Sequence, residues 1–508
     1  MAGAGAGNRN LARLAEEVAE RRGDYPALVF EGRTYSSAEL HERATRLALD
    51  VAPGDRVVVM LENSPDVPAL YHAAWRAGAV VTPVIFLLTS EELRRILVDC
   101  EPALVVTSDT FRSTVDAAAA GLGLRVAVAG DLDETEPAPI VPRTDDDLAA
   151  LVYTGGTTGR SKGVMLTHAN LWEAGRRGHE AGNVPGIVRA LICLPLAHAF
   201  GLLVLAIGLQ SDERPQSVLM RWFDPDEWLR LAQEHRSQVA PVVPSMLHLL
   251  LARPLEEYDL SELRYIGSGA APLPRETIAE LGRRLPHVEL REGYGLTESA
   301  GLVATNLPGR VRHGTVGLPV PGCEVRLADD GEICVRSPTV MKGYWRSPEL
   351  TAETLRDGWL HTGDIGRIDA DGYLTIVDRK KDLIIRGGFN VFPRDVEEAL
   401  LEHPAITGAC ALGRPDETLG EEVVAFVTVA MSRRLDGGSQ RAEAAASPAP
   451  ERAVEPSEEE LFAFGKERLG GYKYPREIHI VSSLPLTPVG KVDRKALREL
   501  VPTRGGIR

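Results

Sequence analysis

The stretch "RVVVMLENSPDVPALYHAAWRAGAVVTPV", from Arg56 to Val84, alternates between two kinds of apolar pattern. It begins and ends with short β-branched runs, which are typical of strands buried on both faces, and its middle has the apolar spacing of a helix. Two such strands joined by a helix form a parallel βαβ unit. The alternation continues through "SEELRRILVDC" (90–100), "ALVVTS" (103–108) and "RVAVAG" (125–130). The sequence therefore predicts an α/β fold with doubly wound βαβ-type sheets.

The same alternation surrounds a glycine-rich loop further along the chain. A strand predicted at 147–154 leads into this loop, and a helix predicted at 169–182 follows it. Later strands, within 237–251, 263–273 and 288–299, also end in polar or glycine-rich segments. In open α/β sheets, ligands bind outside the carboxyl ends of the strands. We therefore expect these loops to line a ligand site.

The pattern changes after about residue 310. Short strands with turn signals, at 323–337 and 366–379, predict a β-rich subdomain, and a small α+β unit follows near Lys381. The sequence thus predicts a large N-terminal domain at residues 1–380 and a small C-terminal domain at residues 381–508. A segment rich in Ala, Pro and Ser at about 432–457 has too little apolar content to form a core, and we expect it to be a disordered insertion.

Composition excludes several classes of partner. The 508 residues carry a formal net charge of -15, so the surface repels nucleic-acid phosphates and anionic lipid headgroups. Five dispersed cysteines without metal-ligand spacing fit a reduced compartment, and no apolar signal region precedes the first charged residues. The longest apolar run, 191–209, contains Pro195 and His198, which favours a buried strand, turn and helix over a membrane span. We expect a cytoplasmic protein without nucleic-acid partners, and a homodimer is compatible with the sequence.

The glycine-rich loop itself, "YTGGTTGRSKGVMLTH" (153–168), has the ingredients of an anion site. Its glycines allow backbone N–H groups to turn toward an anion, its threonines add hydroxyl donors, and Lys162 supplies charge. Lys162 follows a serine and precedes a glycine, so the segment does not match the Walker A pattern. Only eight of the 57 basic residues are lysine; a site that persists with lysine either needs a compact ammonium or is one of a few scattered lysines without a special role. The loop is predicted to hold a polyphosphate, and a merely flexible loop is the alternative.

Further motifs follow the loop in a set order. They are "GSGAAPL" (267–273), "GYGLTES" (293–299), "TGD" (362–364), "DRKKDLIIRGGFNVFPRDVEEAL" (378–400) and "PLTPVGK" (485–491). Together with the loop they resemble the adenylate-forming superfamily of acyl-CoA synthetases, nonribosomal adenylation domains and firefly-type luciferases. The resemblance extends over nearly the whole chain, from about residue 27 to 500. It implies that ATP activates a carboxylic acid as acyl-AMP and that coenzyme A then displaces AMP.

The resemblance implies a nucleotide site in the large domain. Glu298 resembles the Mg²⁺ ligand, and Thr297 lies beside it on the α-phosphate; both belong to the implied catalytic groups. His198 resembles a residue between the acyl pocket and the thiol entrance, with a core histidine as the alternative. The residues implied to hold the β- and γ-phosphates are Thr154, Gly155, Gly156, Thr157, Thr158, Gly159 and Lys162. The residues implied to form the adenine slot are Gly269, Ala270, Ala271, Tyr294 and Gly295.

The resemblance also assigns residues near and within the C-terminal domain. Asp364 is implied to accept hydrogen bonds from the ribose hydroxyls, and Arg379 to reach ribose and phosphate. Lys381 occupies the hinge about which the small domain, mobile in this family, swings between the two half-reactions. Lys491 occupies the position of the catalytic adenylation lysine. The positions implied to face coenzyme A are Gly387 and Gly388, with Lys473 as a weaker candidate.

The loop departs from the family pattern at two positions. Gly155 stands where the family usually has serine, and Ser161 where it commonly has proline. A hydrogen bond to a charged group contributes roughly 1.5–3 kcal/mol, so losing the hydroxyl is expected to slow adenylation by about one to two decades. This departure leaves open a second function, in which the chain performs only the thioester step on acyl-AMP made elsewhere.

The segments expected to form the acyl pocket offer small and aliphatic side chains and no carboxylate to anchor an amino group. Gly267, Gly269 and Gly301 are expected to leave room, which favours an uncharged hydrophobic acid, either a fatty acid or a ring-bearing acid. The compact segment between Asp364 and Arg379 favours coenzyme A over a carrier protein as acceptor. A non-catalytic acyl or nucleotide sensor is the third alternative. The charged groups that argue against a sensor are Glu298, Asp364, Arg379 and Lys491.

Overall fold

The computed structural model describes residues 9–154, 161–416, 418–429, 456–487 and 492–501. The chain packs as two compact units. The first comprises Met1–Thr362 and Gly366–Ile376, and the second comprises Gly363–Ile365 and Val377–Arg508. The boundary predicted after residue 380 is that of a C-terminal domain which rotates between two arrangements. This boundary stays a prediction.

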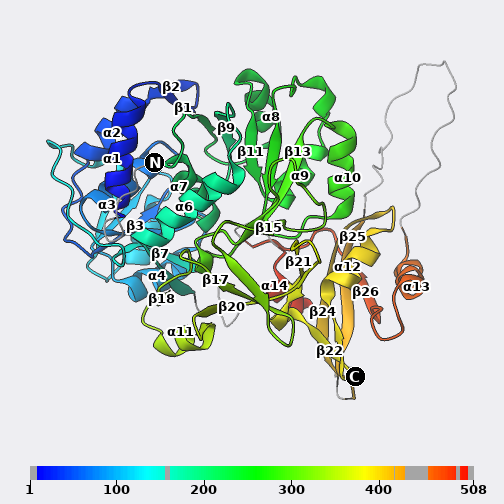
Figure 1. The fold of residues 1–508 in the computed structure, drawn as a ribbon. Coiled ribbons are helices and arrows are strands. Elements are labelled where there is room, and N and C mark those ends of the chain that lie inside the picture. The colour runs from blue at the N-terminus through cyan, green and yellow to red at the C-terminus, as the bar shows by residue number, and fades with distance from the viewer. Residues whose placement is uncertain (1–8, 155–160, 417, 430–455, 488–491, 502–508) are drawn as a thin grey trace, which may run out of the picture. The chain divides into compact units, whose positions relative to one another are not determined.

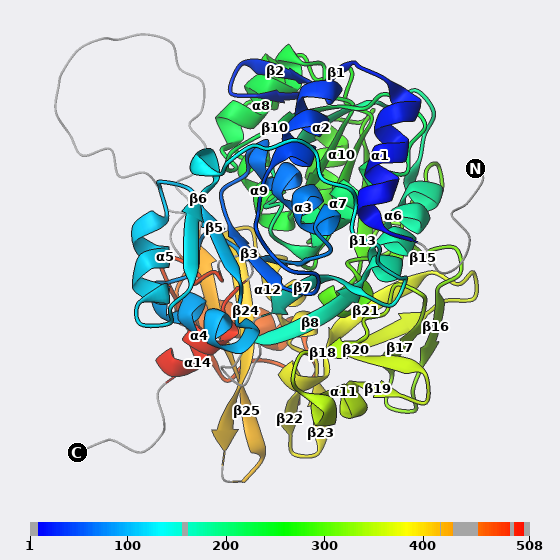
Figure 2. The same ribbon diagram turned by 90° about the vertical axis from the view of Figure 1, so that its left-hand side faces the viewer.

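A seven-stranded sheet in the first unit has the order β18-β8-β7-β4-β3-β5-β6 (Figure 2). Along β3, Val57 and Val59 enter one core cluster while Val58 and Met60 enter another, so both faces of the strand are covered. The α/β prediction is confirmed. The parallel strands are β3 (Arg56–Met60), β4 (Val80–Pro83), β5 (Leu104–Thr107), β6 (Arg125–Val128) and β7 (Leu148–Thr154). The helices that connect them are α3 (Asp66–Arg76), α4 (Ser90–Cys100) and α5 (Arg112–Ala119).

The other two strands of this sheet are not predicted by the sequence. β8 (Lys162–Thr167) runs antiparallel to β7, and β18 (Gly343–Tyr344) runs antiparallel to β8. Lys162 therefore begins a strand, whereas the sequence places it within a loop. Helix α6 (His168–Gly182) begins directly after β8, because Thr167 and Asn170 form a reciprocal capping box.

A nine-stranded sheet, also in the first unit, has the order β15-β14-β13-β12-β11-β9-β10-β1-β2 (Figure 1). Leu191 and Val218 pack on the face covered by α8, α9 and α10, while Ile192 and Leu219 pack on the other face. Residues 191–209 contain the end of β9, a turn and helix α7, as predicted. The strands are β1 (Pro26–Phe30), β2 (Arg33–Ser36), β9 (Arg189–Ile192), β10 (Gln216–Leu219), β11 (Val239–Val242), β12 (Tyr265–Ser268), β13 (Glu289–Tyr294), β14 (Ala304–Thr305) and β15 (Leu318–Pro319). The helices are α7 (Ala199–Gly208), α8 (Pro225–Glu234), α9 (Pro244–Leu251) and α10 (Arg275–Arg284).

The β-rich subdomain predicted after residue 310 is present. Its sheet has the order β16-β17-β20-β19, with β21 beside β20. β16 and β17 form an antiparallel hairpin in which Glu324 faces Arg336. The elements are β16 (Glu324–Leu327), β17 (Glu332–Arg336), α11 (Pro348–Thr354), β19 (Leu355–Arg356), β20 (Trp359–Ile368) and β21 (Leu374–Arg379).

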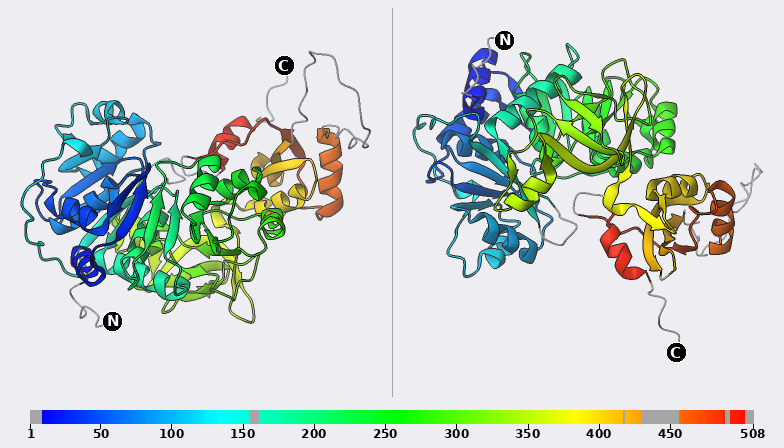
Figure 3. Two further views of the ribbon diagram at one scale, coloured as in Figure 1. Left: turned by 90° about the horizontal axis from the view of Figure 1, so that it is seen from above. Right: turned by 60° about the horizontal axis from the view of Figure 1, so that its bottom comes forward.

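The second unit has the α+β character that the sequence predicts (Figure 3). Long antiparallel strands β24 and β25 carry α12 and α13 on a core that includes Val396, Leu461 and Ile478. The predicted insertion at about 432–457 lies outside the described residues except for its last two, of which Ser457 caps α13. The elements are β22 (Ile384–Arg386), β23 (Phe389–Val391), α12 (Pro393–Leu401), β24 (Ile406–Asp416), β25 (Gly420–Val429), α13 (Glu458–Arg468), β26 (Glu477–Ile480) and α14 (Arg494–Leu500).

The sequence does not predict the N-terminal elements. Helix α1 (Leu11–Arg22) begins at Asn10, whose side chain accepts a hydrogen bond from Ala12 N, and α2 (Ser37–Arg46) begins with a capping box. Short 3-10 turns complete the described chain: η1 (Ala129–Asp131), η2 (Leu255–Glu257), η3 (Thr297–Ser299) and η4 (Lys380–Asp382). Across the described residues, none of the helices combines the length and the apolar character that a bilayer span requires.

Candidate nucleotide and acyl site

Three strand ends in the first unit supply the predicted nucleotide-site residues. β7 ends at Thr154, β12 at Ser268 and β13 at Tyr294. β12 and β13 are parallel neighbours, so the segments that follow them leave the sheet at one edge. This is the edge at which ligands of open α/β sheets bind.

The phosphate loop joins β7 to β8. Thr154 and Lys162 lie opposite each other at the loop end of this hairpin. The Tyr153 hydroxyl donates to the Asp99 carboxylate, and Trp345 Nε1 donates to the Asp99 carbonyl at 3.1 Å, so the start of the loop is anchored to α4. A hydroxyl and an ammonium therefore flank the loop. The predicted phosphate-binding residues that lie outside the described residues are Gly155, Gly156, Thr157, Thr158 and Gly159.

Glu298 lies in the turn η3, directly after β13. Leu296 N donates to Ser299 Oγ at 3.1 Å, and Ala300 adopts a left-handed φ of 53°, so the chain turns tightly around Glu298. Thr297, beside it, is buried. Residues 296–300 therefore form a tight turn that holds Thr297 and Glu298 side by side.

A tyrosine that the sequence does not single out joins two of the predicted residues. The Tyr344 hydroxyl donates to Glu298 Oε1 at 2.8 Å. Lys162 Nζ lies 5.4 Å from the centre of the Tyr344 ring. The structure thus brings Lys162 and Glu298 to opposite parts of one side chain. The only signal in the sequence is the proximity of Tyr344 to Lys342, one of the eight lysines.

The predicted adenine slot lies on the segments after β12 and β13. A Cβ on Gly295 would lie 2.2 Å from Gly301 O, and a Cβ on Gly269 would lie 3.2 Å from Gly293 O. Both glycines therefore allow close approach of backbone segments. Ala270 has φ +72°, a left-handed conformation that L-residues rarely adopt. Ala271 and Tyr294 are half-buried beside these backbone segments.

His198 is half-buried at the N-cap of α7, where its Nδ1 accepts a hydrogen bond from Phe200 N at 3.3 Å. The Phe200 ring lies 3.7 Å from the position of a Cβ on Gly269, which places the start of α7 against the adenine-slot segment. Asn63 fixes the backbone that precedes His198: its Nδ2 donates to Leu194 O at 2.9 Å, and its Oδ1 accepts from Leu196 N at 2.9 Å. Sequence reasoning does not identify Asn63.

The two residues predicted to contact the ribose lie side by side in the second unit. Arg379 Nε lies 3.0 Å from Asp364 Oδ1, and the Asp364 side chain is 5% exposed while that of Arg379 is 51% exposed. The buried carboxylate is thus oriented by an arginine that extends toward solvent. Such an arrangement offers a carboxylate acceptor and a guanidinium donor side by side.

Of the other predicted residues of the second unit, Lys381 follows Arg379 closely, whereas the glycine turn and Lys473 lie further along the chain. Lys381 is exposed in η4, and Gly387 and Gly388, with φ +56° and +82°, form the turn between β22 and β23. Lys473 Nζ lies 2.5 Å from Asp395 Oδ2, which raises the pKa of this lysine. Lys491 lies outside the described residues.

The donor set around Glu298 bears on the predicted Mg²⁺. Among the described residues, no group of three or more His, Cys, Asp and Glu side chains could hold a metal ion. A single carboxylate beside a phosphate loop fits a cation that takes most of its ligands from nucleotide phosphates and water, as Mg²⁺ usually does. Glu298 therefore fits the role of a single protein ligand to a nucleotide-bound Mg²⁺.

Comparisons with known proteins cover nearly the whole chain. Residues 15–345 match the AMP-binding enzyme family, and residues 395–491 match the AMP-binding enzyme C-terminal domain. A feruloyl-CoA synthase of Amycolatopsis sp is 37% identical over 491 residues, covering 92% of this chain and 94% of that protein. A long-chain-fatty-acid–CoA ligase of Bacillus subtilis (strain 168) is 32% identical, covering 97% of this chain and 94% of that protein.

Solved structures agree with these matches. ATP-bound MatB from Rhodopseudomonas palustris superposes with a TM-score of 0.85 at 32% identity, covering 97% of this chain and 99% of that one. The resemblance to the adenylate-forming superfamily and the predicted fold class are therefore confirmed. The chain belongs to the AMP-binding enzyme family.

Proposed function

We propose that this chain is an AMP-forming acid–thiol ligase. It joins a hydrophobic carboxylic acid, uncharged apart from its carboxylate, to the AMP part of ATP with release of pyrophosphate, and then transfers the acyl group from acyl-AMP to coenzyme A with release of AMP. The observation that carries the proposal is the convergence of Lys162 and Glu298 on Tyr344, next to a phosphate loop in an AMP-binding family chain. Relatives named feruloyl-CoA synthase and long-chain-fatty-acid–CoA ligase support coenzyme A as the acceptor.

The chemistry requires a carboxylate to approach the α-phosphate of ATP, although both groups are anionic. Lys162 and Thr154 bind the β- and γ-phosphates, and Thr297 donates to the α-phosphate. Glu298 would hold Mg²⁺, which when bound neutralises phosphate charge. Lys491 places an ammonium between the carboxylate and the α-phosphate. Preorganised donors of this kind stabilise the charge that develops in the transition state.

The second unit contributes in both half-reactions. Asp364 accepts hydrogen bonds from the ribose hydroxyls, and Arg379 contacts ribose and phosphate. Rotation about Lys381 then exchanges Lys491 for the turn at Gly387 and Gly388, which approaches the pantetheine thiol. The thiol displaces AMP, and the acyl group leaves as a thioester. Lys473, held by Asp395, is the weaker candidate for a contact to coenzyme A.

The acyl pocket takes a hydrophobic acid. Gly267 is open, because a Cβ there would meet no atom within 4 Å. The sequence also names Gly269 and Gly301 as leaving room, but a Cβ at each would lie 3.2 Å from a backbone oxygen. These two glycines serve backbone packing, so Gly267 supplies the space.

A panel of carboxylic acids with ATP, Mg²⁺ and coenzyme A tests the proposal, with AMP and acyl-CoA measured separately. Formation of both products with a fatty or aromatic acid is the expected outcome. AMP release without thioester would overturn coenzyme A as acceptor. Thioester formation from supplied acyl-AMP alone would favour the thioester-only alternative that Gly155 raises. Absence of both reactions with retained nucleotide binding would favour a sensor.

Two further parts of the proposal concern the whole protein. We place the enzyme in the cytoplasm, with the net charge of -15 and the dispersed cysteines as support. We also propose that the protein forms a homodimer. Cell fractionation and multi-angle light scattering test these two statements.

A further inference from the structure

The segment Met341–Trp345 lies between the lysine-bearing strand and the glutamate turn. On one side it follows β8: Lys342 N donates to Met165 O at 2.9 Å, and Trp345 N donates to Gly163 O at 2.8 Å. Its third and fourth residues, Gly343 and Tyr344, form β18, the edge strand beside β8. The segment therefore has a fixed register on the strand that begins at Lys162.

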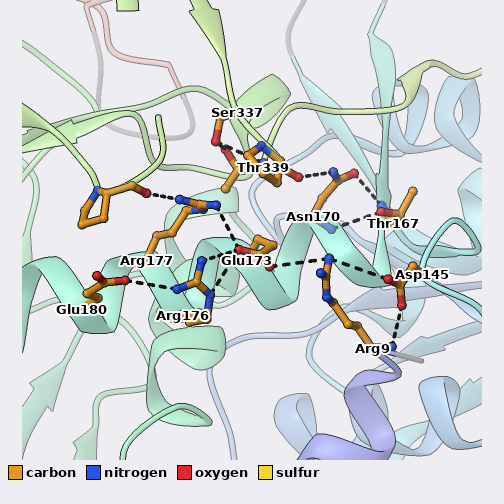
Figure 4. A network of polar contacts seen from close by, with 12 residues as sticks. Arg9, Asp145, Thr167, Asn170, Glu173, Arg176, Arg177, Glu180, Ser337 and Thr339 are labelled. Carbon is orange, nitrogen blue, oxygen red and sulfur yellow. Dashed lines mark hydrogen bonds and ion pairs between the residues drawn. The ribbon is translucent and has the colours of Figure 1, made fainter. Parts of the chain in front are cut away.

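The start of this segment is also fixed. Asn170 Nδ2 donates to Pro338 O at 2.8 Å and to Val340 O at 2.9 Å. Figure 4 shows Asn170 between its capping partner Thr167 and the chain near Thr339. Asn170 is 8% exposed, so these bonds are shielded from water. The chain enters Met341 already positioned by α6.

On its other side the segment contacts Glu298 twice. Met341 N donates to Glu298 O at 2.8 Å, which holds the backbone of the turn. The Tyr344 hydroxyl donates to Glu298 Oε1 at 2.8 Å, which holds the side chain. Two contacts from one rigid segment fix both the position of the turn and the direction of the carboxylate.

Tyr344 is suited to be a donor here. It is 5% exposed, and a tyrosine hydroxyl ordinarily keeps its proton up to a pH of about 10. The hydroxyl therefore keeps its proton throughout the neutral range and donates it to the carboxylate. Because one carboxylate oxygen accepts this bond, the orientation of the other oxygen is fixed as well.

We infer that Tyr344 is a positioning residue, whose hydroxyl orients the Glu298 carboxylate toward a nucleotide-bound divalent cation. The inference rests on the proposed function. It assigns to one tyrosine the link between the two charges of the site, since Lys162 lies over its ring and Glu298 binds its hydroxyl. The ring contacts Lys162 and the hydroxyl contacts Glu298. Replacing Tyr344 by phenylalanine therefore removes only the contact to Glu298.

The test compares Tyr344→Phe with a matched control, Tyr373→Phe. Tyr373 is 7% exposed, and its hydroxyl donates to Arg310 O at 3.0 Å, in the same unit. Calorimetry measures binding of α,β-methylene ATP, which cannot be cleaved to AMP, with Mg²⁺ and with EDTA. We expect Tyr344→Phe to lose about tenfold in affinity with Mg²⁺ and less than about twofold with EDTA, because a bond to a charged group is removed. Tyr373→Phe should behave as wild type under both conditions.

A double-mutant cycle completes the test. In a Glu298→Gln background, Tyr344→Phe should have little further effect on Mg²⁺-dependent binding, because the group it positions is gone. Equal loss with Mg²⁺ and EDTA, additive effects in the cycle, or wild-type binding by Tyr344→Phe would each overturn the inference while leaving the proposed function intact. Failure of the wild type to bind the Mg²⁺–nucleotide would instead overturn the proposed function and the inference together.

Discussion

Single residues of the nucleotide site are constrained chiefly by the space around the backbone. Gly295 lies where Gly301 O approaches to 2.2 Å of a would-be Cβ, and Ala270 is held at a positive φ. Such strained or crowded positions persist when the surrounding structure enforces them. The strain at Ala270 and the crowding at Gly295 both fall on segments that the family resemblance assigns to the adenine slot.

We predict that Gly295→Ala destabilises the fold by at least about 1–3 kcal/mol, because backbone must shift to admit the Cβ. Gly282→Ala is the control: Gly282 is exposed in α10 with no atom within 4 Å of a Cβ, so alanine should stabilise by about 0.5–1 kcal/mol. Urea denaturation measures both. Similar stability of the two variants would show that Gly301 moves away without cost.

His72 makes stability depend on pH. It is 7% exposed in α3, and its pKa is lowered to about 3, chiefly by burial and then by His41 and Arg76. The unfolded value is about 6.5. Because the folded pKa lies below the unfolded one, the unfolded chain binds the proton more readily. The free energy of unfolding is therefore unaffected by His72 above about pH 6.5 and decreases as the pH falls below that value. Among the described residues, its Nε2 has no hydrogen-bond partner.

We predict that the wild type loses about 1.4 kcal/mol per pH unit through His72 below about pH 6.5. His72→Leu should reduce this slope and change stability little at pH 7.5, because an unpartnered buried nitrogen is removed. Denaturation at pH 7.5, 6.5 and 5.5 supplies the comparison. An unchanged slope in His72→Leu would assign the acid sensitivity to other groups.

Among the elements, α14 lies just after Lys491, the proposed adenylation lysine, and packs on the core of the second unit. Lys491 precedes the described residue Val492, which bridges to Leu486 and leads into α14. Arg494 NH2 donates to Glu397 Oε1 at 2.6 Å, and its NH1 donates to Ala411 O at 2.6 Å. The start of α14, just after Lys491, is therefore anchored by a half-buried ion pair to α12.

We predict that Arg494→Lys slows adenylation about tenfold, because an ammonium cannot reproduce the two-sided contact of the guanidinium and the lysine segment loses its position. Thioester formation from supplied acyl-AMP should stay near the wild-type rate. Arg468→Lys, at a partly exposed ion pair with Glu402 in the same unit, should change neither half-reaction. Equal losses in both half-reactions of Arg494→Lys would indicate a general loss of folding in the second unit.

The whole molecule divides into two compact units, and the proposed reaction divides into two half-reactions. The first unit carries Lys162 and Glu298 on rigid strand ends, while Lys381 and Lys491 belong to the second. The proposed rotation of the second unit would present different residues in turn, so that one acyl-AMP is made and then consumed. The two half-reactions should therefore depend on different residues of the second unit.

We predict opposite defects for two variants of the second unit. Lys491→Ala should lose about 10²–10³ in adenylation, the usual cost of removing one preorganised charged donor, and should convert supplied acyl-AMP normally. Lys381→Pro should retain adenylation and lose thioester formation, because proline restricts φ at the hinge. Separate assays of pyrophosphate release and of acyl-CoA formation compare them. Parallel losses in both variants would exclude alternation between two arrangements.

Sequence by itself determined the α/β class and the candidate residues. A strand buried on both faces, such as Arg56–Met60, has a β-branched signature that needs no knowledge of its neighbours. The sequence motifs likewise identify Lys162 and Glu298 without any knowledge of the three-dimensional structure. The N-terminal strand β1 escaped prediction because its parallel partner, β10, lies far along the chain, with Leu28 opposite Ser217.

Only the tertiary structure decided which groups act together. Tyr344 reaches Glu298 across 46 residues, because β18 pairs with a strand that Lys162 begins, and neither strand has a sequence signature. Asn170 and Arg494 likewise make contacts to segments distant in sequence, at Val340 and Glu397. Local patterns specify which faces are apolar, whereas the direction of one hydroxyl toward one carboxylate depends on the packing of separate sheets.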